Sequence, residues 1–149
     1  MNRTEATRHP LVGVTRRRVD YSETDQMGVV YHARYLVWLD VGRTELLRTT
    51  GVSYRELEAL GLRLAVSDLS IRYRRAARYD DPIRVRTWIR ERASRRIGFG
   101  YAVEHDETDE LLATAVTALL VLDRDFNFSR LPQAVADRLD PIPDPVRLT

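Results

Sequence analysis

The sequence predicts an α+β domain, in which an antiparallel sheet of about five to six strands packs against one long helix. One strand-like segment comes first, a long amphipathic segment follows, and four further strand-like segments fill most of the remaining chain. With 149 residues, 44% of them hydrophobic, residues 1–149 have the composition of a single domain, whose core is expected over about 11–139. A domain of this size has much surface for its volume, which favours oligomerisation.

The first strand is predicted within residues 11–21. The ten residues before it are polar and are expected to fray. From Leu11 to Tyr21 apolar and charged residues alternate, as in a strand with one exposed face. Residues 22–28 are rich in turn formers, and Gly28 can adopt a positive φ. A strand is therefore expected to run into a polar turn.

The long helix is predicted over Ala33–Thr50, where apolar residues recur on one face and Gly51 provides the stop. Gly42 costs about 1 kcal/mol relative to Ala in mid-helix, and close approach of a strand or a second helix would compensate for it. Ser53–Glu56 has the pattern of a capping box and predicts a short second helix that ends near Gly61.

Four strand candidates follow the second helix. Short connections at residues 79–82, 93–96 and 106–110 separate them and predict antiparallel hairpins. Pro132–Leu139 predicts a short last helix, and the Pro-rich tail after it is expected to lack regular structure. The strand candidates are residues 64–73, 83–92, 97–105 and 111–122.

Composition excludes several classes of site. The absence of Cys excludes disulfides and thiolate nucleophiles, and the three His residues lack the spacing of a metal site, so no metal is expected. There is no G-x-S-x-G elbow of a serine hydrolase. A net charge of +2 argues against nucleic-acid binding. Without a long apolar run or a leader-like N-terminus, a cytoplasmic protein with no membrane insertion is expected.

Asp25, in the turn before the long helix, has two interpretations. Asp is common in turns and as a cap of helix N-termini. Alternatively, the apolar residues that follow would place the carboxylate at the edge of a dry pocket, beside the unpaired N–H groups and positive end of the helix. Because a thioester has a good leaving group, a carboxylate and an oxyanion-binding helix end suffice for its hydrolysis.

The segment 21–48, YSETDQMGVVYHARYLVWLDVGRTELLR, resembles the signature of acyl-CoA thioesterases of the 4-hydroxybenzoyl-CoA thioesterase/YbgC family. Weaker similarity extends from Val12 to Asp123. The resemblance implies the hotdog fold, in which a sheet wraps a central helix and two protomers join their sheets. It also implies a thioester hydrolase without a cofactor, with CoA as part of the substrate, that forms a homodimer or homotetramer.

Site residues follow from the same resemblance. Asp25 falls on the family's catalytic aspartate, which acts either as nucleophile or as general base on water. The backbone N–H of His32 falls on the group that polarises the thioester carbonyl, and the His32 side chain is a second catalytic candidate. Asp40 stands where many YbgC-like sequences have Glu, which could change substrate preference. Substrate contacts are expected from Gly28, Val29, Val30 and Tyr31.

Arginine clusters are candidates for anion contacts, although a solvated surface is the simpler interpretation for any single one. Arg95 and Arg96 are the exception, since an exposed pair in a hairpin could grip phosphates, and similar basic residues bind the CoA nucleotide in some family members. A second cluster lies at residues 72–78. The apolar lining of the acyl pocket is expected from Val30, Leu64, Val66 and Trp38.

Rival functions remain open from sequence alone. The same fold could bind acyl-CoA or an acyl carrier protein without catalysis, or act as a hydratase, although hydratases usually carry a His base in a different motif. The acyl group, the choice between CoA and carrier protein, and the physiological pathway are not specified by the sequence.

Overall fold

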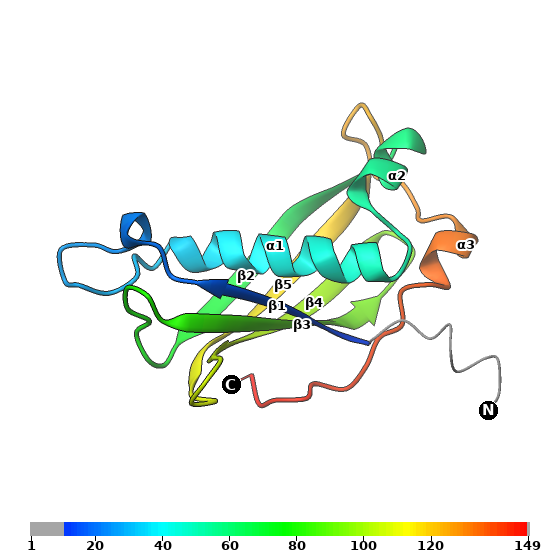
Figure 1. Cartoon of the computed structure of the whole chain (residues 1–149). Helices are drawn as coiled ribbons and strands as arrows, with labels where there is room; N and C mark the ends of the chain where they lie inside the picture. The colour runs from blue at the N-terminus through cyan, green and yellow to red at the C-terminus, as the bar shows by residue number, and fades with distance from the viewer. Residues whose placement is uncertain (1–10, 149) are drawn as a thin grey trace.

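The computed structural model describes residues 11–148, so the expectation for the first ten residues lies outside the described part. One five-stranded sheet curves around α1, which lies across its inner face (Figure 1). The elements in chain order are β1 Val12–Arg18, the 3-10 turn η1 Tyr21–Glu23, α1 Arg34–Thr49, α2 Tyr54–Ala59, β2 Arg63–Tyr73, β3 Pro82–Arg92, β4 Arg96–His105, β5 Leu111–Leu122 and α3 Gln133–Ala136.

The predicted elements agree closely with these bounds. β1 is shorter than predicted, because the chain turns through η1 before Asp25. Local signals that were read from the sequence are present: Gly28 and Gly51 have φ of 76° and 79°, and the Ser53 hydroxyl accepts the Glu56 N–H at 3.1 Å. The α+β prediction is confirmed.

The sheet order is β1-β3-β4-β5-β2, with every pair antiparallel. Hairpins join β3 to β4 and β4 to β5, as predicted, but the predicted hairpin between β2 and β3 is wrong. β2 pairs with β5 at one edge, and β3 lies between β1 and β4. The connection after β2 makes backbone hydrogen bonds with β5 and with the residue after β1. The Arg74 N–H donates to the Leu112 carbonyl, and the Asp80 N–H donates to the Val19 carbonyl.

The core lies between the sheet and the inner face of α1, where the largest buried side chains include Trp38, Leu39 and Leu46. Gly42 faces β3. A Cβ there would lie 2.6 Å from Thr87 Oγ1 and 3.2 Å from Val85 Cγ1, so a side chain would force the two elements apart. The close approach of a strand that was expected to compensate for this glycine is therefore present.

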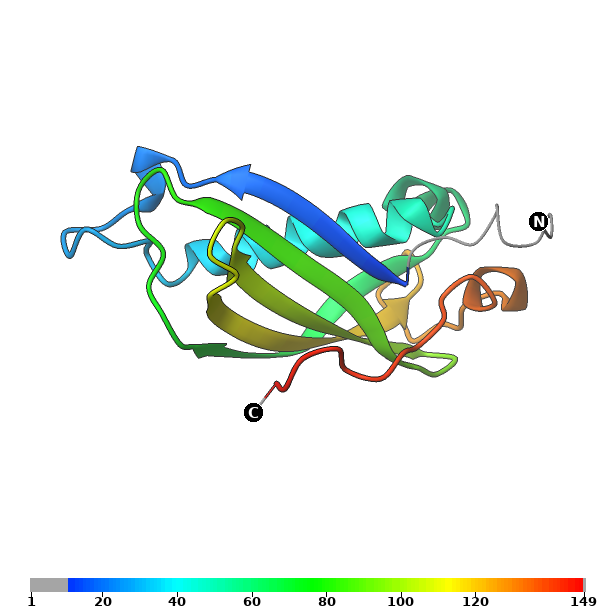
Figure 2. The same cartoon turned by 60° about the horizontal axis from the view of Figure 1, so that its bottom comes forward.

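The C-terminal segment, residues 140–148, crosses the outer face of the sheet without helix or strand (Figure 2). Its Asp144 carboxylate accepts the indole N–H of Trp88 at 2.9 Å and pairs with Arg90. Burial opposes the charge, but the hydrogen bonds from Arg90 and Trp88 outweigh it and lower the pKa of Asp144. This segment covers Trp88, which is fully buried.

Candidate functional site

The loop between β1 and α1 carries Asp25 in a tight turn. Asp25 N–H donates to the Val29 carbonyl and Gly28 N–H donates to the Asp25 carbonyl, both at 2.9 Å. Asp25 Oδ1 accepts the Met27 N–H at 2.8 Å, which fixes the orientation of the carboxylate. Its other oxygen has no donor within residues 11–148. One half of the carboxylate therefore stabilises the turn, and the other half remains available for chemistry.

Glu23 ties this loop to the rest of the fold. Only 6% of the residue is exposed. Its Oε1 accepts from Arg17 Nη2 at 2.7 Å and from Asp20 N–H at 2.9 Å, and its Oε2 accepts from Trp38 Nε1 at 2.7 Å. Burial favours the neutral acid, but these donors and the Arg17 charge outweigh it and lower the pKa of Glu23. The ionised carboxylate thus joins β1, the loop and α1 just before Asp25.

A cavity of about 240 Å³ opens at the N-terminal end of α1. Four of the residues predicted for the site meet in it: Asp25, Val29, Val30 and His32. Gly28 and Tyr31 belong to the same loop but do not line the cavity. The complete lining is Asp25, Met27, Val29, Val30, His32, Tyr35, Tyr73, Arg74, Arg75 and Ala76.

His32 presents its backbone N–H at the start of α1. That N–H has no hydrogen-bond acceptor in the part of the chain that the structure describes. The His32 carbonyl is held by the Tyr73 hydroxyl at 2.7 Å. Since the first turn of α1 contains no acidic residue, no side chain of that turn neutralises the positive end of the helix. A backbone donor without an acceptor thus belongs to a residue that lines the same cavity as Asp25.

Two tyrosines form the inner wall of the cavity. Tyr35 is buried, and its hydroxyl accepts the Ala77 N–H at 3.1 Å. Tyr73 packs edge-on against it, with ring centroids 5.1 Å apart. Burial raises the pKa of both phenols, and both therefore stay protonated at neutral pH. The His32 ring is exposed and lies 4.5 Å from the Tyr31 ring.

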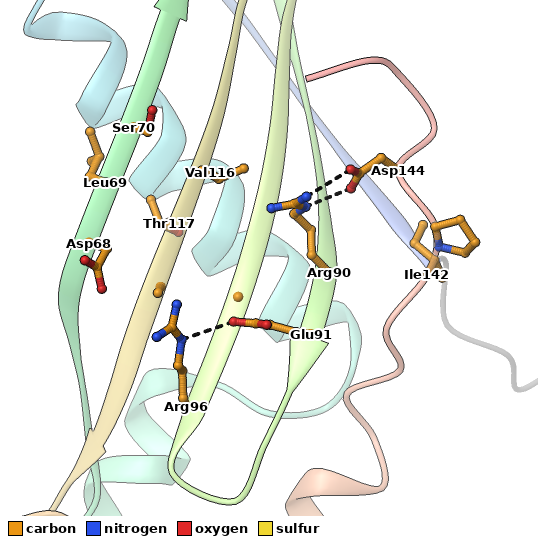
Figure 3. A pocket seen from close by; sticks show the side chains of 13 residues that line it. Asp68, Leu69, Ser70, Arg90, Glu91, Arg96, Val116, Thr117, Ile142 and Asp144 are labelled. Atoms are coloured by element: carbon orange, nitrogen blue, oxygen red, sulfur yellow. Dashed lines mark hydrogen bonds and ion pairs between the residues drawn. The ribbon is translucent and has the colours of Figure 1, made fainter. Parts of the chain in front are cut away.

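Arg95 and Arg96 lie away from this cavity within the same chain. The hairpin that carries them is at the end of the sheet opposite the Asp25 loop (Figure 1). Arg96 Nε contacts Glu91 Oε1 at 3.1 Å. It lines a separate cavity of about 610 Å³ on the face of the sheet away from α1 (Figure 3). One chain alone does not bring these arginines to Asp25.

Of the predicted acyl lining, Val30 lines the cavity of the single chain, and Leu64 and Val66 do not. Trp38 is 1% exposed and lies in the core, because its indole N–H is satisfied by Glu23. Sequence reasoning also missed Tyr73 as part of the wall. Arg74 and Arg75, in the arginine run that the sequence offered only as a candidate anion contact, line the same cavity.

The described residues contain no group of three or more His, Cys, Asp or Glu side chains that could hold a metal ion. Within the same residues, no helix is long and apolar enough to cross a membrane. The groups that meet in the cavity are instead a carboxylate, backbone N–H groups, phenols and guanidinium groups.

The chain is similar in sequence and in structure to known thioesterases. Residues 19–147 match the model of the thioesterase-like superfamily. A putative acyl-CoA thioesterase, YneP of Bacillus subtilis, is 37% identical over 107 residues, 72% of this chain and 77% of its own length. The acyl-CoA thioester hydrolase YbgC of Escherichia coli O6:H1 is 30% identical over 79% of this chain and 88% of its own. A DHNA-CoA thioesterase structure from Staphylococcus aureus superposes with a TM-score of 0.76 at 32% identity, over 80% of each chain.

Proposed function

Because the chain belongs to the thioesterase-like superfamily and is a hotdog-fold acyl-CoA thioester hydrolase similar to YbgC, we propose that Asp25 carries out its chemistry at the start of α1. The observation that supports this most strongly is the shared cavity. Asp25, whose carboxylate has one oxygen without a donor, and His32, whose backbone N–H has no acceptor among residues 11–148, both line it with the apolar Val29 and Val30.

The reaction needs one attack on the thioester carbonyl. As general base, Asp25 takes a proton from water while the water oxygen bonds to the carbonyl carbon; the C–S bond then breaks and the thiolate receives the proton. As nucleophile, Asp25 forms an acyl anhydride with release of the thiolate, and water hydrolyses the anhydride afterwards. In either route the His32 N–H and the end of α1 stabilise the negative charge on the carbonyl oxygen.

The experiment that tests this function is release of free thiol and carboxylic acid from short-chain, long-chain and aromatic acyl-CoAs. The proposal expects equal amounts of acid and thiol from at least one class, and the same rate after treatment with EDTA, since none of the steps above uses a metal or redox cofactor. Tight acyl-CoA binding without acid release would instead support a binding module. Hydration of an enoyl-CoA without thiol release would support a hydratase.

A homodimer is part of the proposal. β2 is an edge strand of the sheet, and its Val66 and Leu69 are 49% and 43% exposed. The outward face of α1 adds exposed apolar side chains at Leu36, Val37 and Val41. An unpaired edge beside apolar surface is suited to pairing with a second copy. A two-fold axis at β2 would also turn the Arg95–Arg96 hairpin of the second copy toward the end of the sheet that holds Asp25.

The double change Val37→Glu and Val41→Glu is expected to convert the dimer to monomer and to lower thiol release, because it places charge in the apolar contact. Both residues are about half exposed in the single chain, so the folded monomer should tolerate the change. Light scattering after size-exclusion chromatography measures the outcome. The matched control is Val14→Glu, an exposed apolar residue on β1, the edge strand on the opposite side of the sheet from β2. A variant that remains dimeric would exclude this face.

Three finer assignments stay proposals. An acyl carrier protein is proposed as an alternative to CoA as the carrier of the acyl group, and a tetramer of two dimers as an alternative to the homodimer. The Arg95–Arg96 pair is proposed to contact the nucleotide of a substrate bound by the second copy. A cytoplasmic location stays a prediction from the sequence.

A further inference from the structure

A second cavity adjoins the catalytic one where β2 ends. Its volume is about 490 Å³, and it is lined by Arg72, Tyr73, Arg74, Arg75, Glu110 and Leu111. Three of these residues, Tyr73, Arg74 and Arg75, also line the cavity that holds Asp25. The two cavities are therefore neighbours along one short stretch of chain, and a ligand that fills the first can continue into the second.

We call Arg72, Arg74 and Arg75 the arginine cluster. None of its guanidinium groups has a hydrogen-bond or ion-pair partner among residues 11–148, and all three residues are exposed. Several other arginines are paired with carboxylates, such as Arg84 with Glu104 and Arg90 with Asp144. Glu110 is the single carboxylate that lines the second cavity. The cluster thus leaves a local excess of positive charge beside the catalytic site.

The backbone beneath the cluster is held in place from two sides. Arg74 N–H and Arg75 N–H both donate to the Leu112 carbonyl of β5, at 2.8 and 3.1 Å. On the other side, the Tyr73 hydroxyl donates to the His32 carbonyl at 2.7 Å. The positions of the three side-chain stems are therefore fixed relative to the start of α1, which reduces the ordering cost of binding an anion.

On the basis of the proposed thioester hydrolysis, we propose that the arginine cluster binds the phosphate groups at the far end of the substrate's pantetheine arm. In CoA, as in a phosphopantetheine-bearing carrier, this arm joins the thioester sulfur to a phosphate. With the thioester at Asp25, an arm that leaves past Tyr73 delivers that phosphate to the second cavity. Guanidinium forks match phosphate oxygens in geometry and charge. Within one chain, the cluster is closer to the site than Arg96, which already pairs with Glu91.

The test compares acyl-CoA with acyl-pantetheine, which carries the same acyl group without phosphates. The wild type should prefer acyl-CoA in kcat/KM. In the double variant Arg74→Gln/Arg75→Gln this preference should fall about tenfold, mainly through KM, because charge-assisted hydrogen bonds to phosphate are lost. The matched control is Arg55→Gln/Arg130→Gln, two exposed arginines whose guanidinium groups also have no partner among the described residues. The control should keep the preference.

Calorimetric binding of CoA itself gives a readout that does not depend on turnover. The cluster variant should bind CoA about tenfold more weakly than the control, and the difference should shrink at high salt. If 4′-phosphopantetheine shows the same dependence on the cluster, the shared phosphate is the group recognised; if only CoA does, it is the nucleotide. Equal CoA affinity in cluster and control variants, or an unchanged preference for acyl-CoA, would overturn the proposal. If the proposed hydrolysis were wrong instead, no thiol would be released from acyl-CoA, while CoA binding would still depend on the cluster.

Discussion

Replacing Glu23 by Ala is expected to lower the free energy of unfolding by about 3 kcal/mol, because it leaves buried donors without an acceptor. The Glu23 side chain is 8% exposed and holds three donors, from Arg17, Asp20 and Trp38. The indole N–H of Trp38 has no route to water, since that residue is 1% exposed. Catalysis should fall as well, because the loop that carries Asp25 loses its anchor.

Urea unfolding measures this effect, with Glu91→Ala as the matched control. Glu91 also pairs with an arginine, but its side chain is 58% exposed, and such pairs contribute about 0–1 kcal/mol. If Glu23→Ala were no more destabilising than Glu91→Ala, the role of Glu23 as an anchor would be wrong.

The charge of Glu23 should also be visible in the dependence of stability on pH. Its pKa is lowered in the folded protein, so the ionised group stabilises the fold above the unfolded value of about 4.3, and this contribution is lost as the pH falls below it. Between pH 6 and pH 3, the urea midpoint of the wild type should therefore fall more steeply than that of Glu23→Gln. Parallel curves for the two proteins would contradict this assignment.

Local signals made most of the fold predictable. Gly28 and Gly51 require positive φ, Ser53 caps α2, and the alternating segments became strands. Pairing of β2 was not predictable in the same way. Its partner β5 begins long after β2 ends in sequence, and a short connection to β3 favours a hairpin unless its backbone groups are satisfied elsewhere. In this fold the carbonyls of Leu112 and Val19 accept hydrogen bonds from backbone N–H groups of that connection.

The same distinction between local sequence signals and long-range strand pairing applies to the candidate site. Asp25, Val29, Val30 and His32 are neighbours in sequence, and one loop brings them to one cavity, so a local motif sufficed to group them. Tyr73, Arg74 and Arg75 reach that cavity only through the pairing of β2 with β5. Trp38 was predicted to line the pocket because it is apolar, as an acyl-binding wall requires. The buried Glu23 carboxylate explains why the indole turns into the core instead.

The change Asp25→Asn is expected to lower kcat by about 10²–10⁴-fold, because an amide can neither accept the proton of water nor attack the carbonyl at neutral pH. The fold should survive. Asp25 is partly exposed, and its structural hydrogen bond, from Met27 N–H to Oδ1, can be accepted equally by the amide oxygen of Asn. The cavity lining formed by Val29, Val30 and Tyr35 is unchanged in this variant, so KM should change little compared with kcat.

The most direct test of the central claim is thiol release at saturating acyl-CoA by the wild type and by Asp25→Asn. The substrate should be the acyl-CoA that the wild type cleaves fastest, and both proteins should first be shown to unfold at the same urea concentration. Turnover is expected from the wild type, and a loss of at least about 10²-fold is expected in the Asn variant. An Asn variant that folds normally and releases thiol at close to the wild-type rate would contradict the assignment of the chemistry to Asp25.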